Sequence, residues 1–237
     1  RYALSMLYFA EKRILDFFAR RKDEKNRKII ATFDEYLVKK QQSLGFELSD
    51  EQKKAVELIN NGDKTLFLIG YAGTGKSTSS RAILELLEET MSYDDIMTIA
   101  LSGIASQRIS DTTGYNSSTI QSLLMKHKEK DFFPYKAILL DEASMVNSVT
   151  FYQIISKIDD DTIFIIVGDD GQLPAIGAGN VLADAIKYEL APICKLTKIY
   201  RQNENQAIAV IANDIRKGEV PAYKEEYEDF KFIDVSI

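Results

Sequence analysis

"TLFLIGYAGTGKS" (65–77) is the stretch that decides the fold. It joins a short apolar run, 65–70, to a glycine-rich turn and then to a segment with helical spacing. The turn "GYAGTGKS" (70–77) matches the pattern G-x-x-x-x-G-K-[ST] at every fixed position. Glycines let the backbone curl so that several N–H groups point at phosphate oxygens, and the next helix presents its positive end to the same anion. The stretch therefore predicts a strand, a phosphate-binding loop and a helix.

Side chains of this turn complete a predicted site for ATP and Mg²⁺. Lys76 is expected to reach the β- and γ-phosphates, and the Ser77 hydroxyl is expected to bind Mg²⁺. Tyr71 is interpreted either as a shield over the loop or as a surface on which a base stacks. The residues predicted to bind the nucleotide are Gly70, Ala72, Gly73, Thr74, Gly75, Lys76, Ser77 and Thr78.

Further strand-like runs alternate with helical segments along the chain. Residues 96–101, 137–142 and 162–168 are short β-rich runs whose apolar parts cover both faces, as in strands that are covered on both sides. Helical spacing fills 76–90 and 148–158 between them. The alternation predicts an α/β fold with a mostly parallel sheet and flanking helices.

The first part of the chain differs because it shows helical spacing without strand alternation. We expect a helical appendage over 1–47, without chemistry of its own, and an ATP-binding domain over 48–237. Apolar faces on the appendage require that it packs on something. The basic run "RRKDEKNRK" (20–28) is interpreted either as a solvated helix face or as a contact for a protein partner.

The composition of the chain limits the classes of protein to which it can belong. The chain has 237 residues, of which 45% are hydrophobic and 28% charged, so a sizeable core can be buried. No apolar run approaches the ~18 residues of a membrane span, and we expect no membrane partner. A net charge of −6 gives no hint of nucleic acid by itself. The single Cys194, expected in a core strand, excludes an internal disulfide, and we expect a cytoplasmic location; the single His127 is expected to be solvated.

Acidic residues follow the run at 137–140, where ligands of open α/β sheets bind. Asp141 suits a Mg²⁺ ligand, and Glu142 suits the base that orients or deprotonates an attacking water. The alternative interpretation is a solvated strand end, but a phosphate loop in the same sheet favours a functional site. The pair therefore extends the predicted site to a second strand.

The run at 162–168 delivers polar residues in "GDDGQLPAIGAG" (168–179). Asp169 is expected to join the hydrogen bonds around the metal, and Gln172 to contact both the γ-phosphate and the attacking water. The alternative is a polar β-turn built on Asp-Asp-Gly. After the run at 96–101, "SGIASQRIS" (102–110) offers small residues that suit a ligand other than the nucleotide.

In order, "GYAGTGKS", "DEAS" (141–144) and "GDDGQLPAIGAG" resemble motifs I, II and III of superfamily 1 DNA helicases. The form GD-x-x-QLP-x-IG-x-G resembles the RecD/TraA-like branch, which includes the alpha subunit of exodeoxyribonuclease V. The resemblance covers residues 46–233 and implies a P-loop NTPase (RecA-like) fold. It also implies ATP hydrolysis coupled to 5′→3′ movement on single-stranded DNA, in DNA repair or recombination.

The resemblance implies further nucleotide contacts. "LSDEQKKAV" (48–56) resembles the opening segment of the branch, with Gln52 in the place that recognises adenine. A capping box between Ser49 and Gln52 is the alternative. "LTKIYRQ" (196–202) resembles the segment whose arginine contacts the γ-phosphate, which would be Arg201.

The resemblance also implies contacts with DNA. "ALSGIASQRIS" (100–110) resembles motif Ia, which implies single-stranded DNA contacts by Ser102, Gly103 and Gln107. Caps at a strand tip and a helix start are the alternative for these residues. In "STIQSLL" (118–124), Gln121 stands where the family usually has histidine.

The family motor has two RecA-like halves with ATP between them, and this sequence ends before a second half. An arginine finger contributes ~10³–10⁵ in rate, so we expect this stretch to bind ATP better than it hydrolyses it. One alternative is an ATP-switched binding module without motor activity, with protein partners at the N-terminal helices. Another is an enzyme that transfers phosphate to a small molecule, although no acceptor or lid segment is recognisable.

Overall fold

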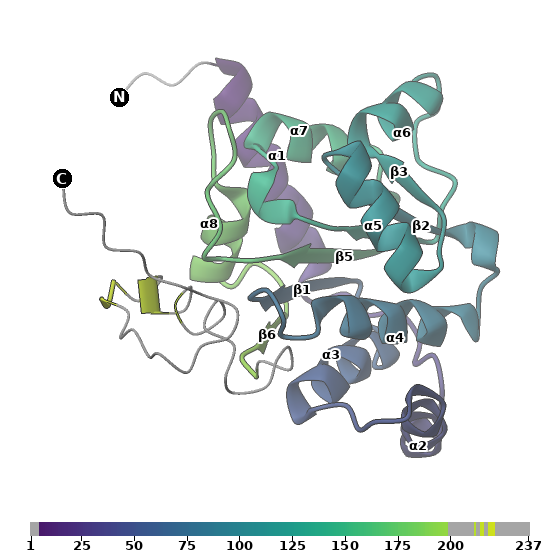
Figure 1. Cartoon of the computed structure of the whole chain (residues 1–237). Helices are drawn as coiled ribbons and strands as arrows, with labels where there is room; N and C mark the ends of the chain where they lie inside the picture. Colours follow the sequence, from purple (N-terminus) through teal and green to yellow (C-terminus); the bar gives the residue numbers. More distant parts are fainter. Residues whose placement is uncertain (1–4, 199–210, 212–213, 216–217, 221–237) are drawn as a thin grey trace. The chain divides into compact units, whose positions relative to one another are not determined.

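The computed structural model describes residues 5–198, 211, 214–215 and 218–220. The chain divides into two compact units, Arg1–Lys198 and Ile199–Ile237. The first unit holds the sheet and all the helices and strands named below (Figure 1). Within the described residues, no helix is both long enough and apolar enough to cross a membrane.

Six parallel strands of the first unit form one sheet in the order β3-β2-β4-β5-β1-β6. They are β1 (Thr65–Gly70), β2 (Ile96–Ala100), β3 (Ser117–Thr119), β4 (Ala137–Leu140), β5 (Ile163–Gly168) and β6 (Ile193–Leu196). The predicted α/β fold with a mostly parallel sheet is therefore confirmed. Strand β5 lies between β1 and β4, which brings the ends of the three motif-bearing strands together.

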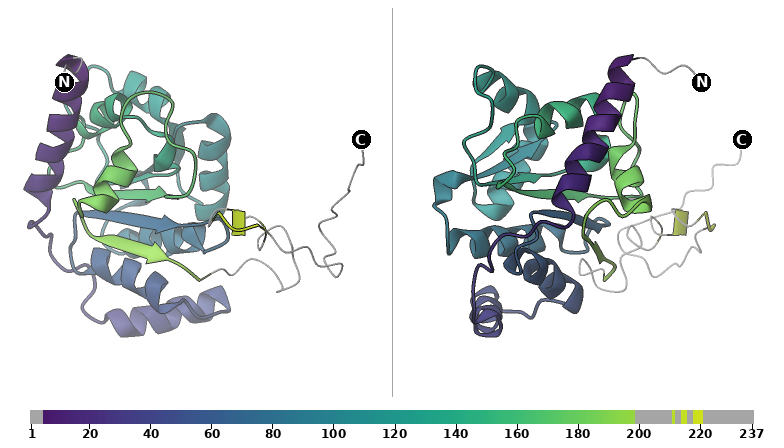
Figure 2. Two further views of the ribbon diagram at one scale, coloured as in Figure 1. Left: turned by 90° about the vertical axis from the view of Figure 1, so that its left-hand side faces the viewer. Right: turned by 180° about the vertical axis from the view of Figure 1, so that it is seen from behind.

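Helices cover both faces of the sheet (Figures 1 and 2). They are α1 (Ser5–Arg21), α2 (Phe33–Leu44), α3 (Asp50–Asn60), α4 (Lys76–Glu88), α5 (Gly103–Thr113), α6 (Ile120–Lys126), α7 (Ser148–Ile155) and α8 (Val181–Lys187). Two short 3₁₀ helices, Tyr93–Asp95 and Ala143–Met145, precede β2 and α7.

Alternate residues of each strand pack into opposite layers of the core. In β1, Phe67 and Ile69 pack on the side of α1, α6, α7 and α8, whereas Leu66 and Leu68 pack on the side of α2, α3, α4 and α5. Because each strand is buried on both faces, its sequence is apolar throughout rather than alternating. Cys194 is 5% exposed in β6, which confirms its predicted place in the core.

Helix α1 lies across one face of the sheet and supplies part of its core (Figure 2). The ring of Phe18 lies 5.4 Å from that of Phe67 and 5.9 Å from that of Phe151. Phe17 makes an edge contact with Phe164 at 6.3 Å. The helices before residue 48 do pack on the domain, as expected, and α1 completes a layer that the sheet needs. The division of the chain at residue 47 stays a prediction.

The basic run 20–28 is not a single solvated helix face. Helix α1 ends at Arg21, and the Arg21 side chain is 3% exposed. It reaches the N-terminal ends of β1 and β5, where neighbouring backbone carbonyls accept its hydrogen bonds. The interpretation as a solvated face is therefore wrong at Arg21, because the carbonyls at this edge of the sheet need a donor.

The expectation of a solvated His127 is also wrong. The side chain is 4% exposed, and its ring meets Phe133 and Tyr135 edge-on at 5.8 Å each. Burial lowers the pKa of His127, and the nearby Lys130, Lys126 and Lys157 lower it further. The lysines around it in the sequence suggested a solvated segment, but the imidazole itself packs as an aromatic ring.

Candidate nucleotide site

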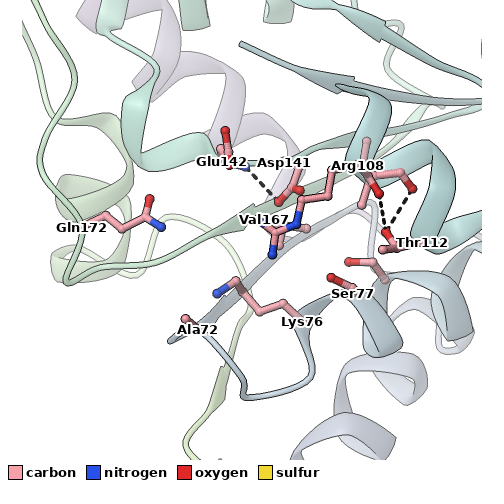
Figure 3. A pocket seen from close by; sticks show the side chains of 11 residues that line it. Ala72, Lys76, Ser77, Arg108, Thr112, Asp141, Glu142, Val167 and Gln172 are labelled. Carbon is pink, nitrogen blue, oxygen red and sulfur yellow. Dashed lines mark hydrogen bonds between the residues drawn. The ribbon is translucent and has the colours of Figure 1, made fainter. Parts of the chain in front are cut away.

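Residues from four elements line one pocket of about 100 Å³ beyond the C-terminal ends of the strands (Figure 3). Residues Ala72, Lys76 and Ser77 come from the phosphate loop and α4, Asp141 and Glu142 from the end of β4, Gln172 from the loop after β5, and Arg108 and Thr112 from α5. The order β4-β5-β1 explains this convergence, because neighbouring parallel strands end at the same edge.

The phosphate loop has the backbone that its glycines allow. Gly73 and Gly75 both have φ +85°, in the left-handed region that favours glycine. A Cβ on Gly70 would lie 2.5 Å from the Thr74 hydroxyl oxygen, so only glycine permits this close turn. Thr74 is buried and its hydroxyl donates to the Tyr71 carbonyl at 2.8 Å. Helix α4 then begins at Lys76 and directs its N-terminus to the pocket.

The Lys76 ammonium lies over its own loop at the pocket. It donates to the Tyr71 carbonyl at 3.0 Å and also to the Gly70 carbonyl. Its charge acts on Asp141 as well, since Lys76 is one of the groups that lower the pKa of that carboxyl. A lysine that donates to loop carbonyls at this pocket can reach a bound phosphate group by a change of side-chain torsions.

Two adjacent carboxyl groups occupy the end of β4. Asp141 accepts a hydrogen bond from the Glu142 backbone N–H at 2.9 Å. Burial raises the pKa of Asp141 above its ordinary value, against the opposing effects of that hydrogen bond, Lys76 and Arg108. Burial and then the charge of Asp141 raise the pKa of Glu142, and Arg108 opposes the rise. A carboxyl group with a raised pKa suits proton transfer near neutral pH.

The backbone of Glu142 is in a conformation that glycine usually adopts. Its φ is +53° and its ψ is 39°, in the left-handed region that a residue with a Cβ rarely occupies. Such residues are frequent at functional sites, where the surrounding structure imposes a strain of ~1–3 kcal/mol on the backbone and so fixes the side chain in a required place. Here the turn leads directly from β4 into the 3₁₀ helix that carries Ser144.

The turn after β5 has the local structure that the alternative interpretation described. The Asp169 carboxylate accepts from the Gly171 N–H at 2.9 Å, and Gln172 N–H donates to the Asp169 carbonyl at 3.2 Å. The polar β-turn is therefore present, while Gln172 still lines the pocket. A part for Asp169 around a metal stays a prediction.

A hydrogen bond that the sequence did not reveal joins the two acidic strand ends. The Ser144 hydroxyl donates to the Gln172 side-chain carbonyl at 3.0 Å, and Ser144 is 5% exposed. The bond leaves the Gln172 amide nitrogen as the group available to the pocket. No spacing in the sequence signals a contact between two polar residues 28 positions apart.

The rest of this loop is anchored on the start of α7. Ser148 N–H donates to the Ala178 carbonyl at 3.1 Å, and the Asn147 amide donates to the Ile176 carbonyl at 3.2 Å. Gly179 has φ +89°, and a Cβ there would lie 1.7 Å from the Ser148 hydroxyl oxygen. The glycines of "LPAIGAG" therefore allow the loop to approach α7 closely.

Some predicted residues lie outside the pocket. Gln52 forms the capping box: its side-chain oxygen accepts from Ser49 N–H at 2.9 Å, and its own N–H donates to the Ser49 hydroxyl at 3.2 Å. The side chain is 2% exposed, so contact with adenine stays a prediction that requires this cap to open. Arg201 lies outside the described residues.

The residues predicted to bind DNA lie at and near the start of α5. Ser102 is the N-cap of α5 and accepts from Ala105 N–H at 3.1 Å, which is the capping alternative. Gln107 donates to the Asp111 carboxylate at 2.7 Å on the exposed surface. All three residues are exposed, and contact of Ser102, Gly103 and Gln107 with DNA stays a prediction.

The donor groups near the pocket fit Mg²⁺. Ser77 and Asp141 supply a hydroxyl and a carboxylate oxygen, the hard ligands that this ion prefers. Within the described part of the chain, no group of three or more His, Cys, Asp or Glu side chains gathers as a metal cage. Mg²⁺ usually takes one or two protein ligands and completes its shell with phosphates and water, so Ser77 and Asp141 suffice.

Comparison with known proteins agrees with this geometry. A family model described as an AAA domain matches residues 47–236. The chain belongs to this AAA domain family. It is 30% identical over 199 residues to the ATP-dependent RecD2 DNA helicase of Deinococcus radiodurans, covering 81% of this chain and 27% of that protein. It is 32% identical over 188 residues to a probable conjugal transfer protein TraA of Sinorhizobium fredii, covering 76% of this chain and 16% of that protein.

Solved structures show the same fold. A Pif1 helicase from Bacteroides in complex with ADP-AlF3 and single-stranded DNA matches with a TM-score of 0.52 and 23% identity, over 74% of this chain and 48% of that one. The resemblance to the first motor domain of RecD/TraA-like superfamily 1 helicases, with its RecA-like P-loop fold, is confirmed. The AAA domain chain thus spans about a quarter or less of the length of these two curated relatives.

Proposed function

We propose that this AAA domain chain is the ATP-binding first motor domain of a RecD-like DNA helicase. In the whole protein it couples ATP hydrolysis to movement along single-stranded DNA and to unwinding. The observation that carries the proposal is that Lys76, Glu142 and Gln172, from three adjacent strand ends, line one pocket. A chance glycine-rich turn or a solvated strand end would not bring these side chains together.

The residues of the pocket divide the work of phosphoryl transfer. The loop N–H groups, the N-terminus of α4 and Lys76 bind the phosphates. Ser77 and Asp141 would hold Mg²⁺, which supplies charge neutralisation to the phosphate oxygens when it is bound. Glu142 accepts a proton from the attacking water, for which its raised pKa is suited. Gln172, fixed by Ser144, offers its amide to the water and the γ-phosphate.

Single-stranded DNA is the proposed polymer, and α5 is its proposed contact. The RecD2 relative is a DNA helicase by name, and the Bacteroides Pif1 structure contains single-stranded DNA. Gly103 presents no side chain, and a Cβ there would meet nothing within 4 Å, so a backbone can approach closely. Ile104 beside it is 86% exposed and suits an apolar contact with a base. A DNA motor acts where DNA and ATP are, so the proposal includes the expected cytoplasmic location.

Protein partners at the N-terminal helices remain part of the proposal. The outer surface of α1 exposes Met6, Tyr8 and Leu15 to 52% or more. The same helix buries Ile14, Phe17 and Phe18 in the core, so only part of its apolar surface is covered. They could meet another segment of a longer protein or a separate chain.

Binding of Mg·ATP by the 237-residue chain tests the proposal. Lys76→Ala is expected to weaken ATP binding about 10- to 100-fold, since charge-assisted hydrogen bonds contribute ~1.5–3 kcal/mol. The matched control is Lys39→Ala, an exposed lysine of α2, which should leave the affinity unchanged. Isothermal titration calorimetry measures both variants, and an unchanged affinity for Lys76→Ala would contradict the site.

Stimulation by DNA separates the motor from an ATP-switched binding module. A longer protein that contains this chain and a second motor domain should hydrolyse ATP faster when single-stranded DNA is added. If such a protein binds ATP but gains no rate with DNA, the binding module is the correct function.

A further inference from the structure

Arg108 lies in the pocket although none of the motifs in the sequence assigns it a function. It belongs to α5, and Thr112, one helical turn further on, lines the same pocket. Figure 3 shows the Arg108 side chain reaching from α5 toward the space between Asp141 and Lys76. The guanidinium therefore approaches the pocket from the side opposite the phosphate loop.

Arg108 is exposed, and its side chain lines the pocket with two carboxyl groups. Among the residues that the structure describes, no hydrogen bond or ion pair of this guanidinium is found. Its charge nevertheless acts on Asp141 and Glu142. Two other arginines differ: Arg21 is bonded to backbone carbonyls, and Arg81 is paired with Glu85 at 2.9 Å. The N–H donors of Arg108 are thus available to a ligand in the pocket.

We propose that Arg108 is a further phosphate-binding residue of this site and binds the terminal phosphate oxygens of the nucleotide from the α5 side. The proposal rests on the proposed function, that the pocket takes Mg·ATP. The loop N–H groups and Lys76 approach the phosphates from one side, and Arg108 supplies positive charge from the other. A planar guanidinium can donate two parallel hydrogen bonds to one phosphate group, which the lysine cannot do.

Helix α5 gives this contact a consequence for DNA binding. Ser102 caps this 11-residue helix and Gly103 begins it, and both are predicted DNA contacts; Arg108 lies less than two turns further along. A packed helix of this length moves as a unit, so DNA bound at its start and phosphate bound at Arg108 share one element. Binding of ATP and of single-stranded DNA should then be coupled through Arg108.

The test compares ligands of different phosphate number on the 237-residue chain. Arg108→Gln is expected to weaken the binding of Mg·ATP about tenfold or more, that of ADP less, and that of AMP not at all, since only the terminal phosphate loses its partner. Arg108→Lys should recover part of the ATP affinity. The control is Arg81→Gln, which removes an exposed arginine of α4 and should change no affinity. Melting temperatures establish that each variant is folded.

A second readout distinguishes a phosphate contact from a general loss of structure. The ATP affinities of the wild-type chain and of Arg108→Gln are each measured with and without a single-stranded oligonucleotide. The ratio of the two affinities is expected to lie closer to one in Arg108→Gln than in the wild type. Equal weakening of ATP, ADP and AMP would overturn the proposal, because it would indicate a structural effect. Unchanged ATP affinity in Arg108→Gln, with affinity lost in Lys76→Ala, would overturn it while the proposed function stands. Absence of ATP binding by the wild-type chain would overturn both the proposed function and the proposal for Arg108.

Discussion

The two edges of the sheet use the same residue type in opposite ways. At the N-terminal edge, Arg21 is 3% exposed and donates five hydrogen bonds, to the Thr65 hydroxyl and to four backbone carbonyls. At the C-terminal edge, Arg108 is exposed and lines a pocket with two carboxyl groups. A cation whose donors are all used by the protein stabilises the fold, whereas one whose donors are available can bind a ligand.

The remaining charges of the two edges follow the same division. At the N-terminal edge, Lys64 pairs with Glu24 at 3.0 Å and with Asp161 at 3.4 Å, and Lys136 pairs with Asp95 at 2.8 Å. At the C-terminal edge, burial raises the pKa of Asp141 and of Glu142, so their ionised forms are less stable there than in water. The charges of the N-terminal edge are therefore paired within the protein. The carboxylates of the C-terminal edge are destabilised by burial, and a bound cation can offset that free-energy cost.

Removal of Arg21 should produce the largest change in stability. Arg21→Ala removes five hydrogen bonds at once, including those to the carbonyls of Lys64 and Thr162 just before β1 and β5, and we expect a loss of about 3–5 kcal/mol in the free energy of unfolding. Urea denaturation followed by circular dichroism measures it. Burial lowers the pKa of Arg21 to about 10, so the side chain stays charged at neutral pH.

The neighbouring Arg20 provides the control for this prediction. Its side chain is 63% exposed and lies 3.7 Å from Asp160, so Arg20→Ala should cost less than about 0.5 kcal/mol. Arg21→Lys should recover little, because an ammonium cannot reach the same set of acceptors. If Arg21→Ala were as stable as Arg20→Ala, the N-terminal edge would not depend on this guanidinium.

The sequence predicts the C-terminal edge better than the N-terminal one. Strand β1 was predicted with its exact bounds and β2, β4 and β5 to within two residues, because apolar runs and strand-end motifs are local signals. The sequence does not signal strand β3, since "SST" (117–119) is short and polar. The partners of Arg21 lie 43 to 141 positions away, and no local pattern reports a contact of that range.

Within the site, the sequence identifies which groups are present but not how they are held. The phosphate loop fixes its own conformation through its glycines, and it places Lys76 without help from distant residues. The Ser144–Gln172 bond and the pocket position of Arg108 depend on how α5 and two strand ends pack. Gln52 shows that a local pattern can also be ambiguous. It fits both the adenine-recognition segment and a capping box, and the structure shows that the capping box is formed.

Substitution of Gly179 should have the next largest effect and should act on the C-terminal edge alone. Gly179→Ala requires a left-handed backbone, which costs ~1–2 kcal/mol, and it displaces Ser148 at the start of α7. We expect a total loss of about 2–4 kcal/mol in the free energy of unfolding. The part beyond the backbone cost is the usual cost of overpacking, here against Ser148. Gln172 is on the same loop, so ATP affinity should fall as well, as calorimetry can measure.

Gly45 is the matched control for the cost of placing an alanine at positive φ. It has φ +75° at the end of α2, and a Cβ there would meet nothing within 4 Å. Gly45→Ala should therefore show only the backbone cost and no change in ATP affinity. Equal losses for the two glycines would mean that the contact between the loop and α7 does not constrain position 179.

The smallest predicted effect compares one carboxyl group from each edge as the pH changes. Because the folded-state pKa of Glu142 is raised, the wild-type chain loses stability as the pH rises through that pKa, and Glu142→Gln removes this loss. Glu142→Gln should be more stable than wild type at neutral pH by on the order of 0.5 kcal/mol after solvent screening, and the two should converge in acid.

Asp95 at the N-terminal edge should give the opposite sign. Its hydrogen bond from Lys136, and then that from Ser92 N–H, lower its pKa, so its contribution to stability is present at neutral pH and is lost as the pH falls through the folded-state pKa. Asp95→Asn should therefore be less stable than wild type at neutral pH and should converge with it in acid. Denaturation curves between acid and neutral pH measure both differences. If both variants shifted stability in the same direction, the two edges would not differ in the way their charges are satisfied.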